Sequence, residues 1–342
     1  MQKHKIFVMV LSLALIFSFS AIASAGKYNE APMLEELVAA GKLPAVEERL
    51  PDEPLIVEPL EEIGEYGGTL YVYTTAAVHL WDGEIIGMEF LLGIEGDYSW
   101  GVPNIVENYK WADDAKSITL YLREGMKWSD GHPFTADDFL YWYEYEFLNE
   151  EVYSWGTPAW LQVGEGTIQM TKIDNYTVRV DFPQPYSLYL NYISHAWGSQ
   201  NGIAGATGVG WYGSFQAAHY AKQFHVDFIG KEKAAQMAEK AGFATWIEHY
   251  ARKTTSFFGL QFYPDSVPTL GAYTCVEKTI DEWVFERNPY YWKVDTEGNQ
   301  LPYIDRVILR YIGDIDVIRE KLSPVSVIML VCRLKPTISP FM

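Results

Sequence analysis

Three features of this 342-residue sequence predict an α/β fold. Hydrophobic residues make up 49% of it, which excludes a disordered chain and is enough for a sizeable core. A β-favouring run at 119–122 is followed by turns and then by a helical pattern that reaches residue 147. Further strand and helix patterns alternate beyond residue 168, and the length allows two domains.

The first residues have the features of a secretory signal peptide. Lys3 and Lys5 precede an apolar run at 6–19, and small residues at 23–25 form a cleavage site. We predict cleavage after Ala25. The alternative is an uncleaved anchor, but the run is short for a bilayer span and lacks a basic flank on its far side. No cysteine lies near the cleavage site, so the sequence does not favour a lipid anchor.

The net charge and the two cysteines limit which partners the chain can bind and whether disulfides can form its scaffold. The net charge of −19 disfavours nucleic acid and anionic membrane surfaces as partners. Removal of the signal peptide, with its two lysines, makes the mature chain still more acidic. Two cysteines, Cys275 and Cys332, do not form a disulfide scaffold.

An acidic segment at 27–66 follows the signal peptide. It contains eleven Asp or Glu and three Lys or Arg. Residues 32–40 predict a short helix with a proline in its first turn and Gly41 at its end. We predict that the segment is an ordered wrap over the domain surface, and the alternative is a solvated spacer.

The stretch 119–147 predicts a strand, two turns and a capped helix. Thr135 is placed to cap the helix, with Asp138 three residues further on, and Asp130 with Gly131 forms a tight turn before them. Aromatic residues then recur at helical spacing and predict a buried face, on which Trp142 is a core residue. These aromatic residues are Phe139, Trp142, Tyr143 and Phe147.

The remaining chain predicts further elements and two loops. Asp113 and Asp114 favour a turn over a pair of catalytic carboxylates, because neighbouring side chains diverge. The acidic run 295–299 lacks the glycine and glutamate positions of a calcium loop and predicts a surface loop. Strands are predicted at 67–73, 168–170, 177–182 and 302–309, and helices at 186–193, 231–242 and 244–252.

The stretch 119–147 resembles the signature of the family 5 extracellular solute-binding proteins. These are the binding subunits of ABC importers for peptides and, in some branches, oligosaccharides. A second block at 282–309 resembles the same family, through its Glu-Arg-Asn-Pro-Tyr-Tyr-Trp and Pro-Tyr-Ile-Asp runs. The resemblance extends from about Gly67 to Leu322. The residues that match the first block are Leu122, Arg123, Gly125, Lys127, Trp128, Asp130, Gly131 and 134–138.

The resemblance implies a periplasmic-binding-protein-like fold of two lobes, type II with an extra subdomain. Only lobe I and the start of lobe II are expected in this chain. The expected divisions are a signal peptide at 1–25, an acidic extension at 26–66, a lobe I core at 67–78 and 169–306, a lobe I subdomain at 79–168 and the start of lobe II at 307–342.

The family pattern stops near residue 322. Residues 323–342 contain no Asp or Glu, although the rest of the chain is acidic. We therefore expect a truncated or frameshifted product with an off-pattern tail from about residue 323. Such a chain is expected to bind ligand weakly or not at all, and to expose the lobe interface and an unpaired strand near Val307.

The candidate ligand-binding residues follow the first strand or lie in loops rich in tryptophan. In the family, the residues after the Gly-Gly-Thr-Leu strand face the ligand cleft. Loop tryptophans offer flat faces to sugar rings or peptide side chains, although burial in the core is the competing interpretation. The candidates are Thr74, Thr75, His79, Trp81, Trp155, Trp160, Trp197 and Trp211.

The predicted function is solute capture without catalysis. The sequence has no GxSxG, HExxH, GK[ST] or GxGxxG motif, and its histidines do not fall at metal spacing. We expect an extracytoplasmic receptor, periplasmic or extracellular, that delivers oligopeptides to an ABC permease, with no cofactor or metal and as a monomer when full length. An oligosaccharide receptor is the alternative, and a secreted carbohydrate-active enzyme with paired carboxylates is a third interpretation.

Overall fold

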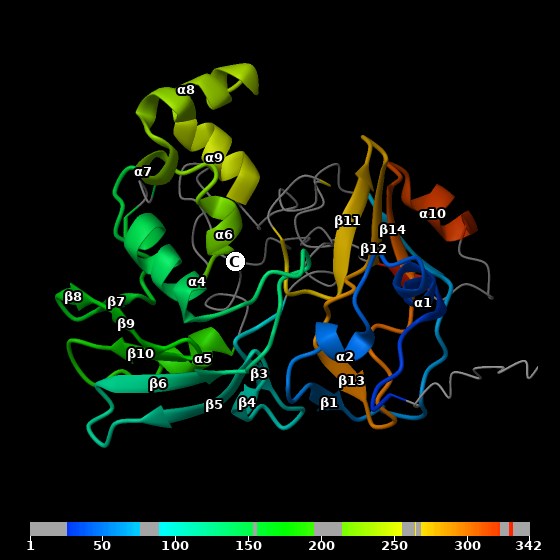
Figure 1. The fold of residues 1–342 in the computed structure, drawn as a ribbon, viewed down its shortest axis with the longest axis horizontal. Coiled ribbons are helices and arrows are strands. Elements are labelled where there is room, and N and C mark those ends of the chain that lie inside the picture. Colours follow the sequence, from blue (N-terminus) through cyan, green and yellow to red (C-terminus); the bar gives the residue numbers. More distant parts are fainter. Residues whose placement is uncertain are drawn as a thin grey trace, which may run out of the picture.

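The computed structural model describes residues 26–75, 89–152, 156–194, 214–254, 264, 268–321 and 328–330. They form two neighbouring groups of strands, each covered by helices (Figure 1). The predicted signal peptide and its cleavage at Ala25 lie outside these residues. Within the described ranges, no helix has the length and apolar character needed to cross a membrane.

One group is built on a five-stranded sheet in the order β11-β12-β14-β2-β15. β2 lies parallel to both β14 and β15, whereas β12 is antiparallel to β11 and β14. Its core holds Val72, Phe285 and Leu309, all buried. The strands are β2 (Thr69–Thr74), β11 (Tyr273–Lys278), β12 (Glu282–Arg287), β14 (Arg306–Tyr311) and β15 (Ile328–Leu330).

The prediction of an unpaired strand near Val307 is wrong. β14 pairs with β12 on one side and with β2 on the other, and Val307 is 1% exposed. The reason is that the chain turns back after β12 and inserts β14 beside β2, more than 200 residues earlier in the sequence. Local sequence does not reveal such a partner, because strand pairing between distant segments is set by the tertiary fold.

The other group is built on an antiparallel sheet in the order β5-β6-β10-β9. It confirms the predicted strand pair that turns near residue 175. The sheet joins strands from both sides of the domain boundary expected at residue 168. Its strands are β5 (Val106–Trp111), β6 (Ser117–Leu122), β9 (Gln169–Asp174) and β10 (Thr177–Asp181). Two small hairpins are β3 (Leu92–Ile94) with β4 (Trp100–Pro103) and β7 (Gln162–Val163) with β8 (Gly166–Thr167).

The predicted capped helix packs on this sheet. The Thr135 hydroxyl accepts a hydrogen bond from the Asp137 amide at 3.3 Å, and the Asp138 carboxylate accepts one from the Thr135 amide at 2.9 Å. α4 (Ala136–Tyr141) continues without a break into a π-helix, η1 (Trp142–Phe147). Trp142 is fully buried, which confirms its assignment to the core.

Replacement of Thr135 by alanine is expected to lower the free energy of unfolding by about 1 kcal/mol, because an orphan amide at the helix N-terminus loses its acceptor. Chemical denaturation monitored by tryptophan fluorescence measures this loss. Thr135→Ser is the matched control, because it keeps the hydroxyl and should retain most of the stability. Equal losses in both variants would show that the hydroxyl contributes nothing.

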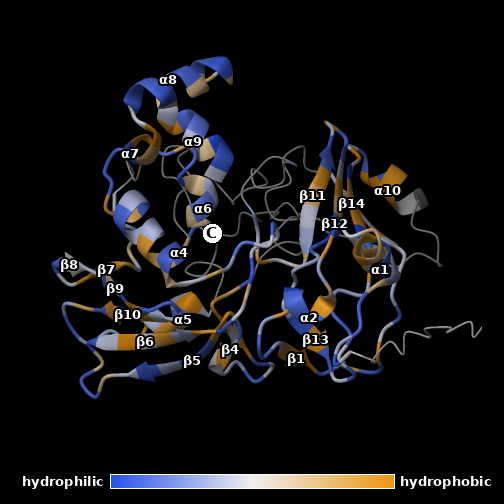
Figure 2. Ribbon diagram, viewed as in Figure 1, coloured by the Kyte–Doolittle hydropathy of each residue, from blue (hydrophilic) through white to orange (hydrophobic). Residues whose placement is uncertain are grey.

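Short helices project from this group of strands (Figure 1). The outermost, α8, is mostly hydrophilic, and it begins after Gly230 and ends before Gly242 (Figure 2). The predicted helices at 231–242 and 244–252 are thereby confirmed, within two residues at each end. The projecting helices are α6 (Ala218–Ala221), α7 (Val226–Ile229), α8 (Lys231–Lys240) and α9 (Trp246–Thr254). α5 (Tyr189–Ile193) lies beside the four-stranded sheet, and α10 (Ile315–Lys321) lies beside the five-stranded sheet (Figure 1).

The acidic N-terminal segment is an ordered wrap, as predicted. It forms α1 (Pro32–Ala39), α2 (Val46–Arg49) and β1 (Leu55–Val57), which pairs in parallel with β13 (Lys293–Asp295). Arg49 is fully buried and anchors the wrap: its guanidinium donates to the Pro289 carbonyl and to Gln300 Oε1, and it pairs with Glu30. A buried, multiply bonded guanidinium ties the segment to the domain.

The loop at 295–299 is a tight turn around one carboxylate. Asp295 Oδ1 accepts hydrogen bonds from the amides of Glu297 and Asn299, and Tyr303 donates to its Oδ2 at 2.6 Å. Burial raises the pKa of Asp295, but these hydrogen bonds outweigh burial and leave the pKa below its usual value. The carboxylate therefore organises the turn.

Candidate functional site

Thr74 and Thr75 lie at the carboxyl end of β2. Thr74 is 2% exposed, and its carbonyl accepts a hydrogen bond from the Ile312 amide at 2.8 Å. β2, β14 and β15 are parallel, so their carboxyl ends share one edge of the sheet. Ligands of open α/β sheets bind beyond such an edge, which makes it a candidate for solute contact.

Among the predicted tryptophans, Trp160 is the one that the described residues contain. It is 4% exposed, and its ring lies 6.2 Å from Tyr189 and 5.8 Å from Tyr192, centroid to centroid. It belongs to the core beside the four-stranded sheet, whereas Thr74 belongs to the other sheet. The candidates that lie outside the described residues are His79, Trp81, Trp155, Trp197 and Trp211.

A cavity of about 410 Å³ opens beside the β3–β4 hairpin. Its walls come from the residues just before β3, from the end of α5 and from the start of β13. Ligand pockets in proteins commonly measure about 300–1,000 Å³, so the cavity is large enough for a small solute or part of one. The lining residues are Glu89, Phe90, Gly93, Ile94, Asn104, Ser194 and Lys293.

Glu89 is the centre of the polar wall of this cavity. Its Oε2 accepts hydrogen bonds from Lys293 Nζ at 2.8 Å and from Asn104 Nδ2 at 3.2 Å. Tyr291 donates its hydroxyl to Glu89 Oε1, and burial raises the pKa of Tyr291 well above its usual value, so it remains a donor. The carboxylate is thus held by three donors, two of them about 200 residues away in the sequence, and is fixed in direction.

The same wall carries one hydroxyl. Ser194 is buried, donates to the Leu190 carbonyl at 2.8 Å and accepts from the Gly101 amide at 3.1 Å. Since this proton is committed to a backbone carbonyl, Ser194 is not poised as a nucleophile. Carboxylate, ammonium, amide and hydroxyl groups together suit the recognition of hydroxyl or amide groups on a solute.

The other reactive groups in the described residues do not form a catalytic arrangement either. Burial raises the pKa of the Cys275 thiol to about 11, so little thiolate exists near neutral pH. The rings of His132 and His219 stack with centroids 3.8 Å apart, and His219 Nε2 lies 2.7 Å from Asp130 Oδ2. No group of three or more His, Cys, Asp or Glu in the described ranges is arranged to hold a metal ion.

Sequence reasoning predicted neither the Glu89–Lys293 ion pair nor the stacking of His132 on His219. Glu89 and Lys293 are 204 residues apart, and His132 and His219 come from the loop before α4 and from α6. No local pattern marks Glu89 as a cavity residue. The one available signal was Lys293, which directly follows the Glu-Arg-Asn-Pro-Tyr-Tyr-Trp run that the family resemblance singled out.

Comparison with known proteins gives a consistent result. Residues 101–336 match the family described as bacterial extracellular solute-binding proteins, family 5 Middle. The chain is 31% identical over 296 residues to the periplasmic alpha-galactoside-binding protein of Rhizobium meliloti (strain 1021), covering 80% of this chain and 37% of that protein. The chain therefore spans well under half the length of this relative.

Two solved structures resemble the fold. An oligopeptide-binding protein OppA superposes with a TM-score of 0.75 at 32% identity, covering 86% of this chain and 43% of OppA. The periplasmic binding protein MelB of Agrobacterium fabrum C58, solved in complex with stachyose, superposes with a TM-score of 0.63 at 26% identity. That match covers 83% of this chain and 41% of MelB.

Proposed function

Because the chain belongs to the bacterial extracellular solute-binding proteins of family 5, we propose that it captures a solute outside the cytoplasm and delivers it to the permease of an ABC importer. The match over residues 101–336 is the observation that carries this proposal. The relatives are named as binding proteins, in keeping with a function that has no chemical step. Export through the signal peptide cleaved after Ala25, and action as a monomer, are parts of the same proposal.

The proposed ligand is an oligosaccharide that carries α-galactosyl groups. The Rhizobium meliloti relative is named for alpha-galactosides, and MelB was solved with stachyose. The polar wall of the cavity supports this class, because Glu89, Asn104 and Lys293 offer the donors and acceptors that sugar hydroxyls need. Phe90, on the same cavity, provides an apolar surface for the face of a sugar ring.

An oligopeptide is the second candidate ligand. It is the class preferred from the sequence, and the OppA structure superposes with the higher TM-score of the two. A carboxylate and an ammonium group on one wall, Glu89 and Lys293, also suit a zwitterionic peptide. The two ligand classes differ in their chemistry, so a direct comparison separates them.

The proposed mechanism is enclosure of the solute between two lobes, of which this chain supplies one side of the cleft. Binding energy in such receptors comes from burying the solute when the lobes close about a hinge. The candidate contacts are the edge at Thr74 and Thr75 and the cavity around Glu89. One side of a cleft buries less of the solute than two, so binding to these residues alone is expected in the millimolar range.

Saturation-transfer NMR tests this proposal, because it detects weak complexes. We expect saturation of the protein to transfer to stachyose, and less or no transfer to tetraalanine at the same concentration. Transfer to tetraalanine alone would select the peptide alternative. Transfer to neither, up to tens of millimolar of each solute, would reject solute capture by this chain.

A matched pair of variants tests whether the solute binds in this cavity. Ile94→Arg puts a long cation at the mouth of the cavity, where Ile94 is 38% exposed, and is expected to reduce the transfer to stachyose at least severalfold. Ile173→Arg makes the same change on β9, at a residue that is 57% exposed and does not line the cavity. It should leave the transfer unchanged, and equal effects of the two variants would exclude the cavity as the binding place.

A further inference from the structure

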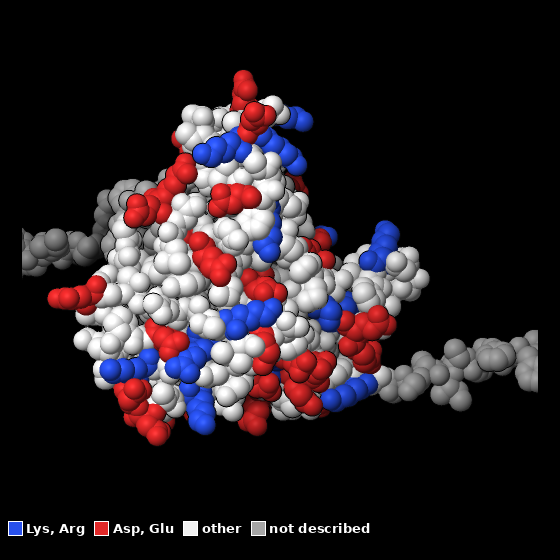
Figure 3. Space-filling model, turned by 60° about the vertical axis from the view of Figure 1, so that its left-hand side comes forward, with Lys and Arg blue, Asp and Glu red and all other residues white. Residues whose placement is uncertain are grey.

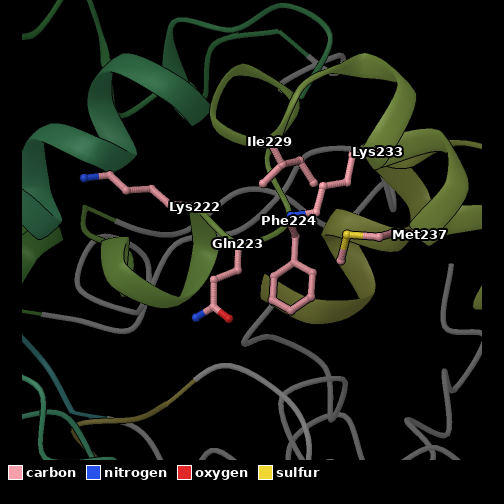
Figure 4. A pocket seen from close by; sticks show the side chains of 6 residues that line it. All are labelled: Lys222, Gln223, Phe224, Ile229, Lys233 and Met237. Carbon is pink, nitrogen blue, oxygen red and sulfur yellow. The ribbon is translucent and has the colours of Figure 1, made fainter.

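A second hollow lies away from the cavity described above, on the projecting helices. It measures about 450 Å³ and runs between the end of α6, α7 and the first two turns of α8; we call it the α6–α8 groove (Figure 4). Phe224, Ile229 and Met237 form its apolar walls. Lys222, Gln223 and Lys233 complete the lining.

The two lysines of the groove are placed differently. The Lys222 chain extends away from the hollow toward the α4–η1 helix, and its ammonium lies 5.8 Å from the Tyr141 ring centroid (Figure 4). The Lys233 chain instead runs toward Phe224, on the groove side. Within the part of the chain that the structure describes, Lys233 makes no ion pair, so its charge is available to a ligand.

The charge around the groove is opposite in sign to that of the whole protein. Residues 214–254 contain six Lys or Arg and four Asp or Glu, a net charge of +2, in a chain whose net charge is −19. Lys and Arg side chains lie among the acidic ones on the projecting part at the top of Figure 3. In addition, Lys253 Nζ lies 5.7 Å from the Phe224 ring centroid. An apolar hollow edged by cations favours a ligand with an apolar body and an anionic head.

We propose that the α6–α8 groove binds an amphiphilic carboxylate, a molecule with a short alkyl body and one anionic head. The alkyl body packs against Phe224, Ile229 and Met237, and the carboxylate pairs with Lys233. The groove has room for one such body, whereas a specific protein interface buries about 800 Å² on each partner. This binding is separate from solute capture and does not depend on it.

The experiment uses octanoate as the probe and the methyl group of Met237 as the reporter. The whole chain is labelled with ¹³C-methyl methionine, and Met237→Leu identifies the Met237 signal. We expect octanoate to shift this signal saturably, with a dissociation constant on the order of 1 mM, and octyltrimethylammonium to shift it less. No saturable shift, or equal shifts with the cation, would overturn the proposal.

Two charge reversals in the first turn of α8 separate a specific contact from general electrostatics. Lys233→Glu removes the cation of the groove and is expected to weaken octanoate binding about tenfold. Lys231→Glu makes the same charge change at an exposed residue that does not line the groove, and should change binding less than about twofold. Both substitutions suit a helix N-terminus, so folding is retained. Equal losses would overturn the assignment of Lys233.

Discussion

Replacement of Asp138 by alanine is expected to lower the free energy of unfolding by about 3–5 kcal/mol. The side chain is 3% exposed and joins three separate elements. Its Oδ2 accepts from Trp128 Nε1 at 3.2 Å and from the Thr135 amide at 2.9 Å, and its Oδ1 accepts from the Ala218 amide at 2.9 Å. Alanine leaves these three donors without an acceptor in a dry site, and each such loss costs about 1–3 kcal/mol before water or relaxation compensates. Urea denaturation followed by circular dichroism measures the loss.

The adjacent aspartate provides the control. Asp137 pairs with Lys172 at 2.8 Å, but its side chain is 61% exposed. Exposed ion pairs contribute about 0–1 kcal/mol, so Asp137→Ala should cost less than about 1 kcal/mol. Asp138→Asn should lie between the two, because its carbonyl oxygen still accepts and its amide nitrogen does not. If Asp138→Ala and Asp137→Ala lower the free energy of unfolding equally, the three hydrogen bonds that Asp138 accepts contribute nothing to stability.

Those features that depend on neighbouring residues could be predicted from the sequence. The cap at Thr135 follows from a hydroxyl and a carboxylate spaced three residues apart. The strand pair β9–β10 follows from β-branched residues on either side of an Asp-Asn turn, and the end of α8 follows from Gly242. In each case the signal and the structure lie within one or two turns of chain.

The candidate site could be predicted only in part, because its groups meet through distant contacts. The position of Thr74 at the edge of the sheet follows from one recognisable strand. The cavity around Glu89 instead requires β13 to return beside the residues that precede β3, some 200 residues earlier. Neither segment carries a sequence pattern that identifies the other as its neighbour in the fold. Long-range proximity of this kind is determined by how the sheets and helices pack.

The π-helix η1 is a second feature that periodicity did not predict. The aromatic residues of 139–147 recur at α-helical spacing, yet the chain widens after Tyr141. The widened segment carries Glu146 into the interior, where it is fully buried. π-helical turns commonly occur where a side chain must be placed off the regular helical face. An acidic residue in an aromatic helix is usually a surface residue, and no local pattern around Glu146 indicates that it is buried.

The surroundings of Glu146 favour its neutral form. Tyr250 donates its hydroxyl to Glu146 Oε1 at 2.5 Å, and Gln216 Nε2 donates to the same atom at 3.1 Å. Tyr141 lies behind Tyr250, with their hydroxyl oxygens 3.1 Å apart, and Oε2 of Glu146 has no hydrogen-bond partner among the described residues. Burial raises the pKa of Glu146 from 4.5 to about 7, against the lowering effect of these two hydrogen bonds. His225 contacts the Tyr250 ring, and burial lowers the pKa of His225, so this imidazole adds little positive charge.

Replacement of Glu146 by glutamine is therefore expected to remove a pH dependence of stability. The folded state holds the Glu146 proton more tightly than the unfolded state does, so this group contributes fully below pH 4.5 and its contribution is lost as the pH rises to about 7. Glutamine resembles the protonated acid and stays neutral. The stability of Glu146→Gln relative to the unchanged protein should thus rise by about 3 kcal/mol between pH 4 and pH 8. Urea denaturation at several pH values measures this difference.

The control for this titration lies two residues away in the same π-helix. Glu144 is exposed, so Glu144→Gln makes the same substitution at a surface residue and should not reproduce the rise in relative stability expected for Glu146→Gln. Asp138, whose pKa burial raises to about 6 despite its three donors, is present in every variant and cancels from the comparison. If Glu146→Gln and Glu144→Gln show the same small change with pH, Glu146 is ionised in the folded protein.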